Sequence, residues 1–135
     1  MRGVHEHMSD LSSLEKARIA AAAALERRAV DPLAIDVHAL VSFADVFVIL
    51  TGHSDRQVRA IAEAVSEAFS LRGEKPLGVE GLEQGRWVLM DLSDVIVHVF
   101  QEEVRNQYDL ERLWSDAPRL DLGLPPPDAR RHSAH

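Results

Sequence analysis

The chain contains no cysteine. Without cysteine there is no disulfide framework, no thiolate nucleophile and no cysteine-built metal site, and the composition is compatible with the cytoplasm. Long hydrophobic runs are also absent, since no apolar run approaches the ~20 residues that a membrane-spanning helix needs. The N-terminus lacks the apolar segment of a signal peptide. We therefore expect a cytoplasmic protein with no membrane partner.

Basic charge is scarce as well. The chain has 15 Lys and Arg residues against 22 Asp and Glu residues, which gives a formal net charge of −7. A large basic surface of the kind that binds nucleic acids is therefore not expected, and contact with RNA would be local. An acidic protein attracts basic partners, and its overall field steers their encounter.

Aromatic residues are few, and both tryptophans and the single tyrosine lie in one stretch, residues 78–114. They are Trp87, Trp114 and Tyr108. The stretch is also acidic, and it contains no nucleophile paired with a base and no set of metal ligands. Strands, acidic turns and aromatic anchors without such a set indicate binding rather than catalysis.

The hydrophobic pattern predicts the element order α-β-β-α-β-β-β-α, which is typical of an α/β fold with a mixed β-sheet flanked by helices. Residues 44–51 are almost continuously apolar, so we expect a central strand that is buried on both faces. The expected helices span residues 12–29, 54–72 and 108–114, and the expected strands span residues 33–37, 44–51, 75–79, 86–91 and 94–100, the last two paired as a hairpin.

The length and the distribution of proline predict a single domain. The chain has 135 residues, which is enough for one hydrophobic core. We expect a flexible N-terminal segment at residues 1–9, one domain at residues 10–115, and a flexible proline-rich tail at residues 116–135.

The turn at residues 51–54, Thr-Gly-His-Ser, supports a second hypothesis, an enzyme that binds nucleotides. Backbone N–H groups at the start of a helix attract anions, and the turn resembles the glycine-serine turn of polymerase-β-like nucleotidyltransferases. Those enzymes hold two metal ions with closely spaced carboxylates on a following strand. The expected strands 75–79 and 86–91 carry no such pair. We therefore expect no metal and no cofactor.

The hairpin supports a third hypothesis and leaves one alternative open. Trp87 alternates with Leu89 on one strand face, and Leu92 follows at the turn. An exposed face would form an apolar patch with a tryptophan anchor for a basic partner, whereas a covered face would pack Trp87 under a helix, and the two interpretations are about equally supported. In the third hypothesis the hairpin pairs with a second copy. His98 shares a face with Ile96 and Phe100, where we expect it to be hydrogen-bonded.

Long motifs in order and spacing resemble the Iojap/RsfS family of ribosomal silencing factors. They are SFADVFVI (42–49), TGHSDRQV (51–58), PLGVEG (76–81), WVLMDLSDVIVHVFQEEVR (87–105) and YDLERLW (108–114). The resemblance implies a nucleotidyltransferase-like α/β fold that has lost its catalytic carboxylates, and no enzymatic activity. It implies binding to ribosomal protein fourteen of the large ribosomal subunit, which blocks the small subunit and represses translation under nutrient limitation. It also implies a homodimer in the free state.

The resemblance places the partner-binding surface on the hairpin. Trp87 would be the aromatic anchor and Leu92 its apolar companion. Glu80 and Asp91 would meet basic side chains of the partner. Leu89, Asp94 and His98 complete the expected set of contact residues.

Overall fold

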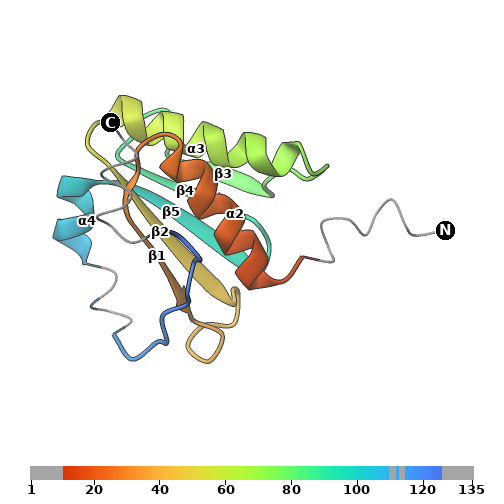
Figure 1. Ribbon diagram of the computed structural model, residues 1–135. Helices are drawn as coiled ribbons and strands as arrows, with labels where there is room; N and C mark the ends of the chain where they lie inside the picture. Colours follow the sequence, from red (N-terminus) through yellow and green to blue (C-terminus); the bar gives the residue numbers. More distant parts are fainter. Residues whose placement is uncertain (1–10, 110–111, 113–114, 126–135) are drawn as a thin grey trace.

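The computed structural model describes residues 11–109, 112 and 115–125, and within them it forms a five-stranded sheet with three helices (Figure 1). The strands stand in the order β1-β2-β5-β4-β3. The pairing of β2 with β5 is parallel and the other pairings are antiparallel, so the sheet is mixed, as predicted. The predicted order of elements is also confirmed. The bounds are α2 Ser13–Leu25, β1 Val30–Asp36, β2 Val46–Gly52, α3 Asp55–Ser70, β3 Gly78–Glu80, β4 Trp87–Asp91, β5 Val95–Gln101 and α4 Glu102–Tyr108.

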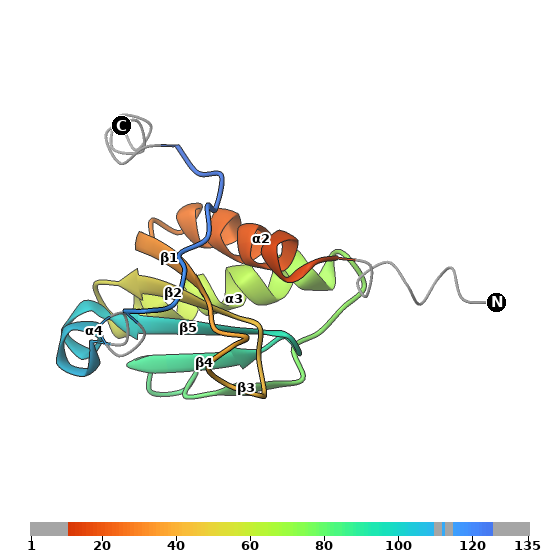
Figure 2. The same cartoon turned by 90° about the horizontal axis from the view of Figure 1, so that it is seen from below.

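Helices α2 and α3 cover one face of the sheet, called here the first face (Figure 2). Helix α2 begins with a capping box, in which the Ser12 side chain accepts from the Glu15 N–H and the Glu15 carboxylate accepts from the Ser12 N–H. Ser54 caps α3 by accepting from the Gln57 N–H. The buried side of α2 consists mostly of alanine, and these short side chains let the helix pack closely on the sheet and on α3.

The opposite side of the sheet, called here the second face, has a separate hydrophobic core. Its members come from β1, β2 and β5, from the connection between β1 and β2, and from Val104 of α4. Every residue of β2 is buried, as predicted for a central strand. In β4, by contrast, buried and half-buried residues alternate, because its second-face side chains are only partly covered. The partly open area of the second face therefore lies over β4 and the edge strand β3.

Helix α4 spans residues 102–108, a segment for which the sequence pattern predicted no helix. Glu102 and Glu103 lie in its first turn, where carboxylates favour a helix N-terminus. The helix ends at Asp109, which has a left-handed φ of 49°. The helix was predicted instead at residues 108–114, and Leu110, Leu113 and Trp114 of that range lie outside the described residues.

A strap formed by residues 117–122 follows the free edge of β1. The Asp36 N–H donates to the Pro118 carbonyl oxygen at 2.8 Å, and the Leu120 N–H donates to the Ala34 carbonyl oxygen at 2.9 Å. Ala117 belongs to the second-face core and Leu122 to the first-face core. The packed part of the chain therefore extends at least to Leu122, past the domain boundary predicted at 115. The predicted N-terminal segment, residues 1–9, lies outside the described residues.

Candidate interaction surface

Five of the seven residues predicted to contact a partner share the second face: Glu80, Trp87, Leu89, Asp91 and His98. The strand register places them there. Glu80 pairs with Leu89, and Leu89 pairs with His98, so these three form one row across β3, β4 and β5. The sequence alternation had placed Trp87 and Leu89 on one face, and the structure confirms that placement.

The other two predicted residues lie elsewhere. Leu92 is only 1% exposed and belongs to the first-face core. It follows Asp91 directly, and consecutive residues of a strand point to opposite faces. Leu92 is therefore not an apolar companion of Trp87 on the surface. Asp94 forms a 2.6 Å ion pair with Lys16 of α2, so it fastens the hairpin turn to that helix.

Six rings form a continuous aromatic row along the second face. The consecutive ring centroids are 6.1 Å apart for Phe43 and Phe47, 4.9 Å for Phe47 and His98, 6.1 Å for His98 and Trp87, and 5.1 Å for Trp87 and Tyr108. Phe100 packs beside this line, 4.7 Å from Trp87. The row is exposed at its two ends, because Phe43 is 65% exposed and Tyr108 is 50% exposed.

Trp87 is both packed against α4 and partly exposed, so each of the two interpretations that the sequence left open holds in part. Its ring packs on Phe100 and against Tyr108 of α4, and its indole N–H donates to Nδ1 of His98 at 3.2 Å. The side chain is nevertheless half-buried rather than buried. The indole is therefore held in one orientation while part of it faces solvent. A rigid, half-exposed aromatic side chain is suited to anchor a protein interface.

His98 is the polar member of the row and is only 5% exposed. Burial lowers its pKa from 6.5 to about 4. Nδ1 accepts a hydrogen bond from the indole N–H of Trp87, so the neutral imidazole carries its own proton on Nε2. Nε2 is buried, and it has no hydrogen-bond partner within the described part of the chain. The ring is therefore a neutral packing element that orients Trp87.

Acidic groups border the row on the β3 side. Glu80 is exposed on the edge strand, and Asp91 is half-buried on β4. The Asp91 carboxylate also accepts from the Ser93 N–H at 2.9 Å within the turn. This edge of the second face therefore combines aromatic surface with negative charge.

The turn after β2 is explained by packing. A Cβ added at Gly52 would lie 3.2 Å from side-chain atoms of both Ile61 and Val58, so glycine permits the close approach of α3. The His53 N–H of this turn is not available to bind an anion, since it donates to the Gln57 side chain at 2.6 Å. Among residues 11–109, 112 and 115–125, no cluster of three or more His, Cys, Asp or Glu side chains could hold a metal ion.

Sequence reasoning missed both exposed ends of the aromatic row. Phe43 lies in the connection between β1 and β2, where no periodicity indicates a face. Tyr108 was expected at the start of a helix at residues 108–114, most of whose apolar side chains were expected in the core. It is instead the last residue of α4, which brings it onto Trp87. The shared face of Ile96, His98 and Phe100 was the one available signal for the middle of the row.

Comparison with known proteins gives consistent matches. The family model described as "Ribosomal silencing factor during starvation" matches residues 10–135. The chain is 47% identical over 105 residues to the ribosomal silencing factor RsfS of Bacillus subtilis, covering 78% of this chain and 89% of that protein. A crystal structure of a Chromobacterium violaceum protein matches with a TM-score of 0.75 and 36% identity, over 78% of this chain and 88% of the other.

A more distant relative is the mouse protein named "Mitochondrial assembly of ribosomal large subunit protein 1". It is 27% identical over 93 residues, covering 67% of this chain and 41% of the mouse protein.

Within the described residues, no helix is long and apolar enough to cross a membrane.

Proposed function

This chain belongs to the family of ribosomal silencing factors, and from that membership we propose that it binds the large ribosomal subunit and sterically blocks joining of the small subunit. The result is repression of translation under nutrient limitation. The resemblance of the sequence motifs points to ribosomal protein fourteen of the large subunit as the docking partner. The name of the mouse relative, which refers to assembly of the ribosomal large subunit, supports the choice of subunit.

The observation that carries this proposal is the aromatic row with its two exposed ends. Phe43 and Tyr108 are large apolar side chains at the surface of the second face, and Trp87 links Tyr108 to the rings in between. The first face is covered by α2 and α3, whereas the second face is only partly covered over β4. A partner that docks on the second face would bury these rings.

Charge defines the kind of partner. Glu80 is exposed at the β3 edge of this surface, and the chain carries a net charge of −7. A basic protein surface complements both the local and the overall charge. In this scheme Trp87, Leu89 and Tyr108 supply apolar contact, and Glu80 and Asp91 face basic side chains.

The mechanism makes and breaks no covalent bond, so the protein acts without catalysis and without a cofactor. Repression follows from occupancy, because a folded domain on the joining surface excludes the small subunit. We also propose a cytoplasmic location and a homodimeric free state that dissociates on the ribosome. If the two copies pair through the second face, self-association and ribosome binding compete for the aromatic row.

Co-sedimentation with separated large and small subunits tests the function, followed by a subunit-joining assay. Selective binding to the large subunit together with reduced joining is the expected result. Failure to bind either subunit would overturn the proposed function. Sedimentation equilibrium of the free protein then gives the oligomeric state.

A substitution at Tyr108 tests the surface. We expect Tyr108→Ala to weaken large-subunit binding about tenfold, because it removes a half-exposed ring next to the Trp87 anchor. Leu71→Ala is the matched control, since Leu71 is 81% exposed and follows α3 on the helical side. We expect it to bind within twofold of the unchanged protein. Equal affinity of both variants would refute this surface while leaving the silencing function standing.

Trp87 is tested more safely with Trp87→Phe than with Trp87→Ala. Truncation to alanine would leave Nδ1 of His98 without its donor and empty the space over Phe100. Such a variant would lose stability along with binding. Phenylalanine removes the same donor but keeps a ring over Phe100. A loss of affinity with only a small fall in melting temperature therefore isolates the role of the indole.

A further inference from the structure

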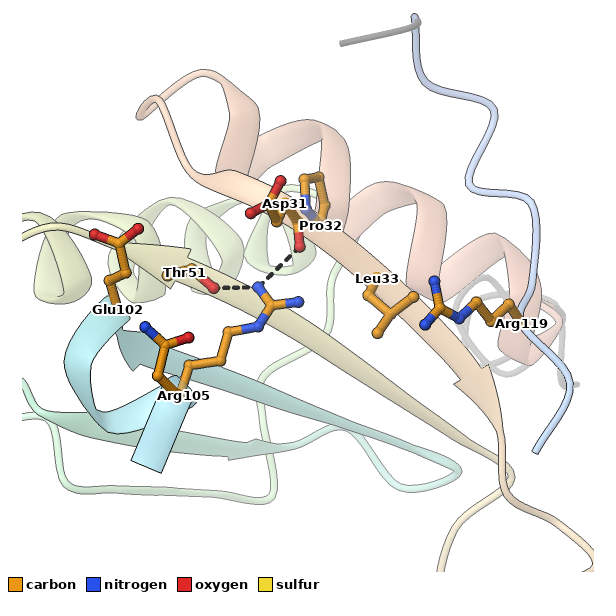
Figure 3. A pocket seen from close by; sticks show the side chains of 8 residues that line it. Asp31, Pro32, Leu33, Thr51, Glu102, Arg105 and Arg119 are labelled. Atoms are coloured by element: carbon orange, nitrogen blue, oxygen red, sulfur yellow. Dashed lines mark hydrogen bonds between the residues drawn. The ribbon is translucent and has the colours of Figure 1, made fainter. Parts of the chain in front are cut away.

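A polar pocket of about 500 Å³ opens at the carboxyl ends of β2 and β5. Its polar lining comes from four parts of the chain (Figure 3). These polar residues are Asp31, Thr51, Glu102, Arg105, Asn106 and Arg119.

The topology explains why a pocket forms there. Strands β2 and β5 are adjacent and parallel, so both end at the same edge of the sheet. The chain leaves β2 into α3, which packs on the first face, and leaves β5 into α4, which packs on the second face through Val104. Open α/β sheets bind ligands outside the carboxyl ends of such strands, and this pocket lies at that edge with Thr51 of β2 and Arg105 of α4 in its lining.

Arg105 is fixed in the centre of this pocket. Its guanidinium donates to the Asp31 carbonyl oxygen at 2.9 Å and to the Thr51 hydroxyl. The carbonyl is presented by an irregularity of β1, where the register shifts between Val30 and Leu33 and Asp31 has a φ of 49°. In Figure 3 the Asp31 carboxylate points away from the guanidinium, so the main-chain oxygen makes the contact. Arg105 is therefore oriented before any ligand arrives.

Arg119 supplies a second guanidinium from the strap. Its backbone is fixed by the bridge to Ile35 of β1, while its side chain is exposed. In Figure 3 the guanidinium groups of Arg105 and Arg119 point toward Leu33 from its two sides. Two arginines from distant parts of the sequence thus line one pocket.

The acidic groups lie at the opposite end of the pocket from Arg119. Figure 3 shows the Glu102 carboxylate beyond Arg105, at the far end of the view from Arg119. Its Oε1 atom lies 3.4 Å from Nδ1 of His53, which draws it toward the turn after β2. The pocket therefore has the Arg119 guanidinium on the side of the strap, the Arg105 guanidinium in its centre and the Glu102 carboxylate at one rim.

We propose that this pocket binds the phosphate group of a small phosphomonoester. Guanidinium groups match phosphate oxygens in geometry and charge. Thr51, Asn106 and the acidic rim can hydrogen-bond hydroxyl groups on the rest of the ligand. The volume lies in the range of small-molecule sites. A nucleic acid would need a longer basic track than two arginines, and the net charge of −7 opposes it.

The test is three separate titrations of the full-length protein, with adenosine monophosphate, with inorganic phosphate and with adenosine. Amide chemical shifts in NMR spectra monitor binding in each titration. We expect saturable shifts at Leu33, Thr51, Arg105 and Asn106 with the nucleotide, weaker ones with phosphate, and none with adenosine. No ribosomal component is present, so the outcome is independent of the proposed silencing function. Shifts that do not saturate, or equal binding of adenosine, would overturn the phosphate assignment.

Arg119→Gln is the decisive variant, because the side chain is exposed and its loss leaves the β1 bridge to the backbone intact. We expect its affinity for adenosine monophosphate to fall about tenfold. Arg72→Gln is the matched control, because it makes the same charge change just after the C-terminal end of α3. We expect its affinity for adenosine monophosphate to stay within twofold of that of the unchanged protein. Equal affinities of the two variants would refute the site. Tighter binding of an RNA oligonucleotide with shifts at the same amides would refute the small-molecule class.

Discussion

At the residue scale, the packing of the second face depends on the contact between His98 and Trp87. The indole N–H donates to Nδ1 of His98, and the imidazole lies between the rings of Phe47 and Phe100. No charged side chain contributes to the shift of the His98 pKa, which burial alone lowers. The neutral imidazole is therefore required for both the packing and the orientation of Trp87.

This requirement predicts a loss of stability in mild acid. The pKa of His98 is about 4 in the folded protein and near 6.5 when unfolded. Because the folded-state pKa is the lower one, the unfolded chain binds the extra proton first, and the free energy of unfolding falls as the pH drops below 6.5. We expect a loss on the order of 2 kcal/mol between pH 7.5 and pH 5. Urea denaturation at several pH values measures it.

His98→Phe is the control for this prediction, since it removes the titrating group and keeps a ring in the row. Its free energy of unfolding should change much less over the same pH range. The exposed His38 acts in the opposite direction, because its hydrogen bond to Asp36 raises its pKa and so favours the folded state at low pH. An unchanged pH slope in His98→Phe would show that His98 does not carry the effect.

The sequence predicted the position of these residues but not their state. Alternation is enough to place Trp87 and Leu89 on one face and His98 beside Phe100. The protonation of His98 depends on rings from β2 and β4 that close over it, and Phe43 enters the row from a connection without periodicity. Contacts of that kind arise from tertiary packing, which no local pattern encodes.

At the scale of elements, one buried ion pair joins α2 to the β4–β5 turn. Lys16 is 5% exposed, and its ammonium donates to Asp94 at 2.6 Å and to the Leu92 carbonyl oxygen at 3.2 Å. Burial by itself raises the pKa of the Asp94 carboxyl, but hydrogen bonds from Lys16 and Ser13 outweigh it and hold the pKa below its usual value. The pair therefore fixes the hairpin beneath the helix.

Lys16→Met is expected to lower the free energy of unfolding by about 2 kcal/mol, because it removes the lysine donor from the Leu92 carbonyl oxygen and from the Asp94 carboxylate, which keeps only its hydrogen bond from Ser13. Arg18→Met on the same helix is the control, since Arg18 is exposed and donates to the Asp121 carbonyl oxygen at 3.1 Å. Chemical denaturation of both variants, of Asp94→Leu, and of Lys16→Met combined with Asp94→Leu measures the coupling. Additive losses in the double variant would mean that the ion pair contributes nothing of its own.

Element prediction succeeded where caps and apolar runs agreed, and failed at α4. The helices predicted from residues 12 and 54 do begin there, and Ser12 and Ser54 are their N-caps in the structure. The segment after β5 has only one buried residue, Val104, so no apolar periodicity indicates its helix. Helix α4 is instead stabilised by the docking of Val104 and Tyr108 on the second face, which is a tertiary effect.

At the scale of the whole molecule, the sheet is asymmetric. Two helices cover the first face over β1, β2, β5 and β4, whereas the second face is closed at β5 and partly open at β4. The sequence predicted the mixed sheet from the buried run of β2 and the order of elements. It did not predict the strap, because residues 117–122 fall within the expected proline-rich tail, whereas in the structure they pair with the edge of β1.

The overall charge predicts how fast the protein meets its partner. With a net charge of −7, a basic ribosomal protein is attracted over a distance set by the Debye length. That length is about 10 Å at 0.1 M salt and about 3 Å at 1 M. We expect the association rate constant with isolated ribosomal protein fourteen to fall several-fold over this range, and the dissociation rate constant to change less. Stopped-flow fluorescence of Trp87 and Trp114 measures both.

Two neutralising substitutions separate local from overall charge. Glu80→Gln and Glu63→Gln change the net charge equally, and both side chains are exposed, but Glu80 borders the aromatic row whereas Glu63 lies on α3. A docking site on the second face requires the larger fall in association rate from Glu80→Gln, because its carboxylate lies nearer the partner's charges. Equal effects would mean that only the overall field steers the encounter. An association rate constant that does not change with salt concentration would mean that the apolar rings, and not charge, determine binding.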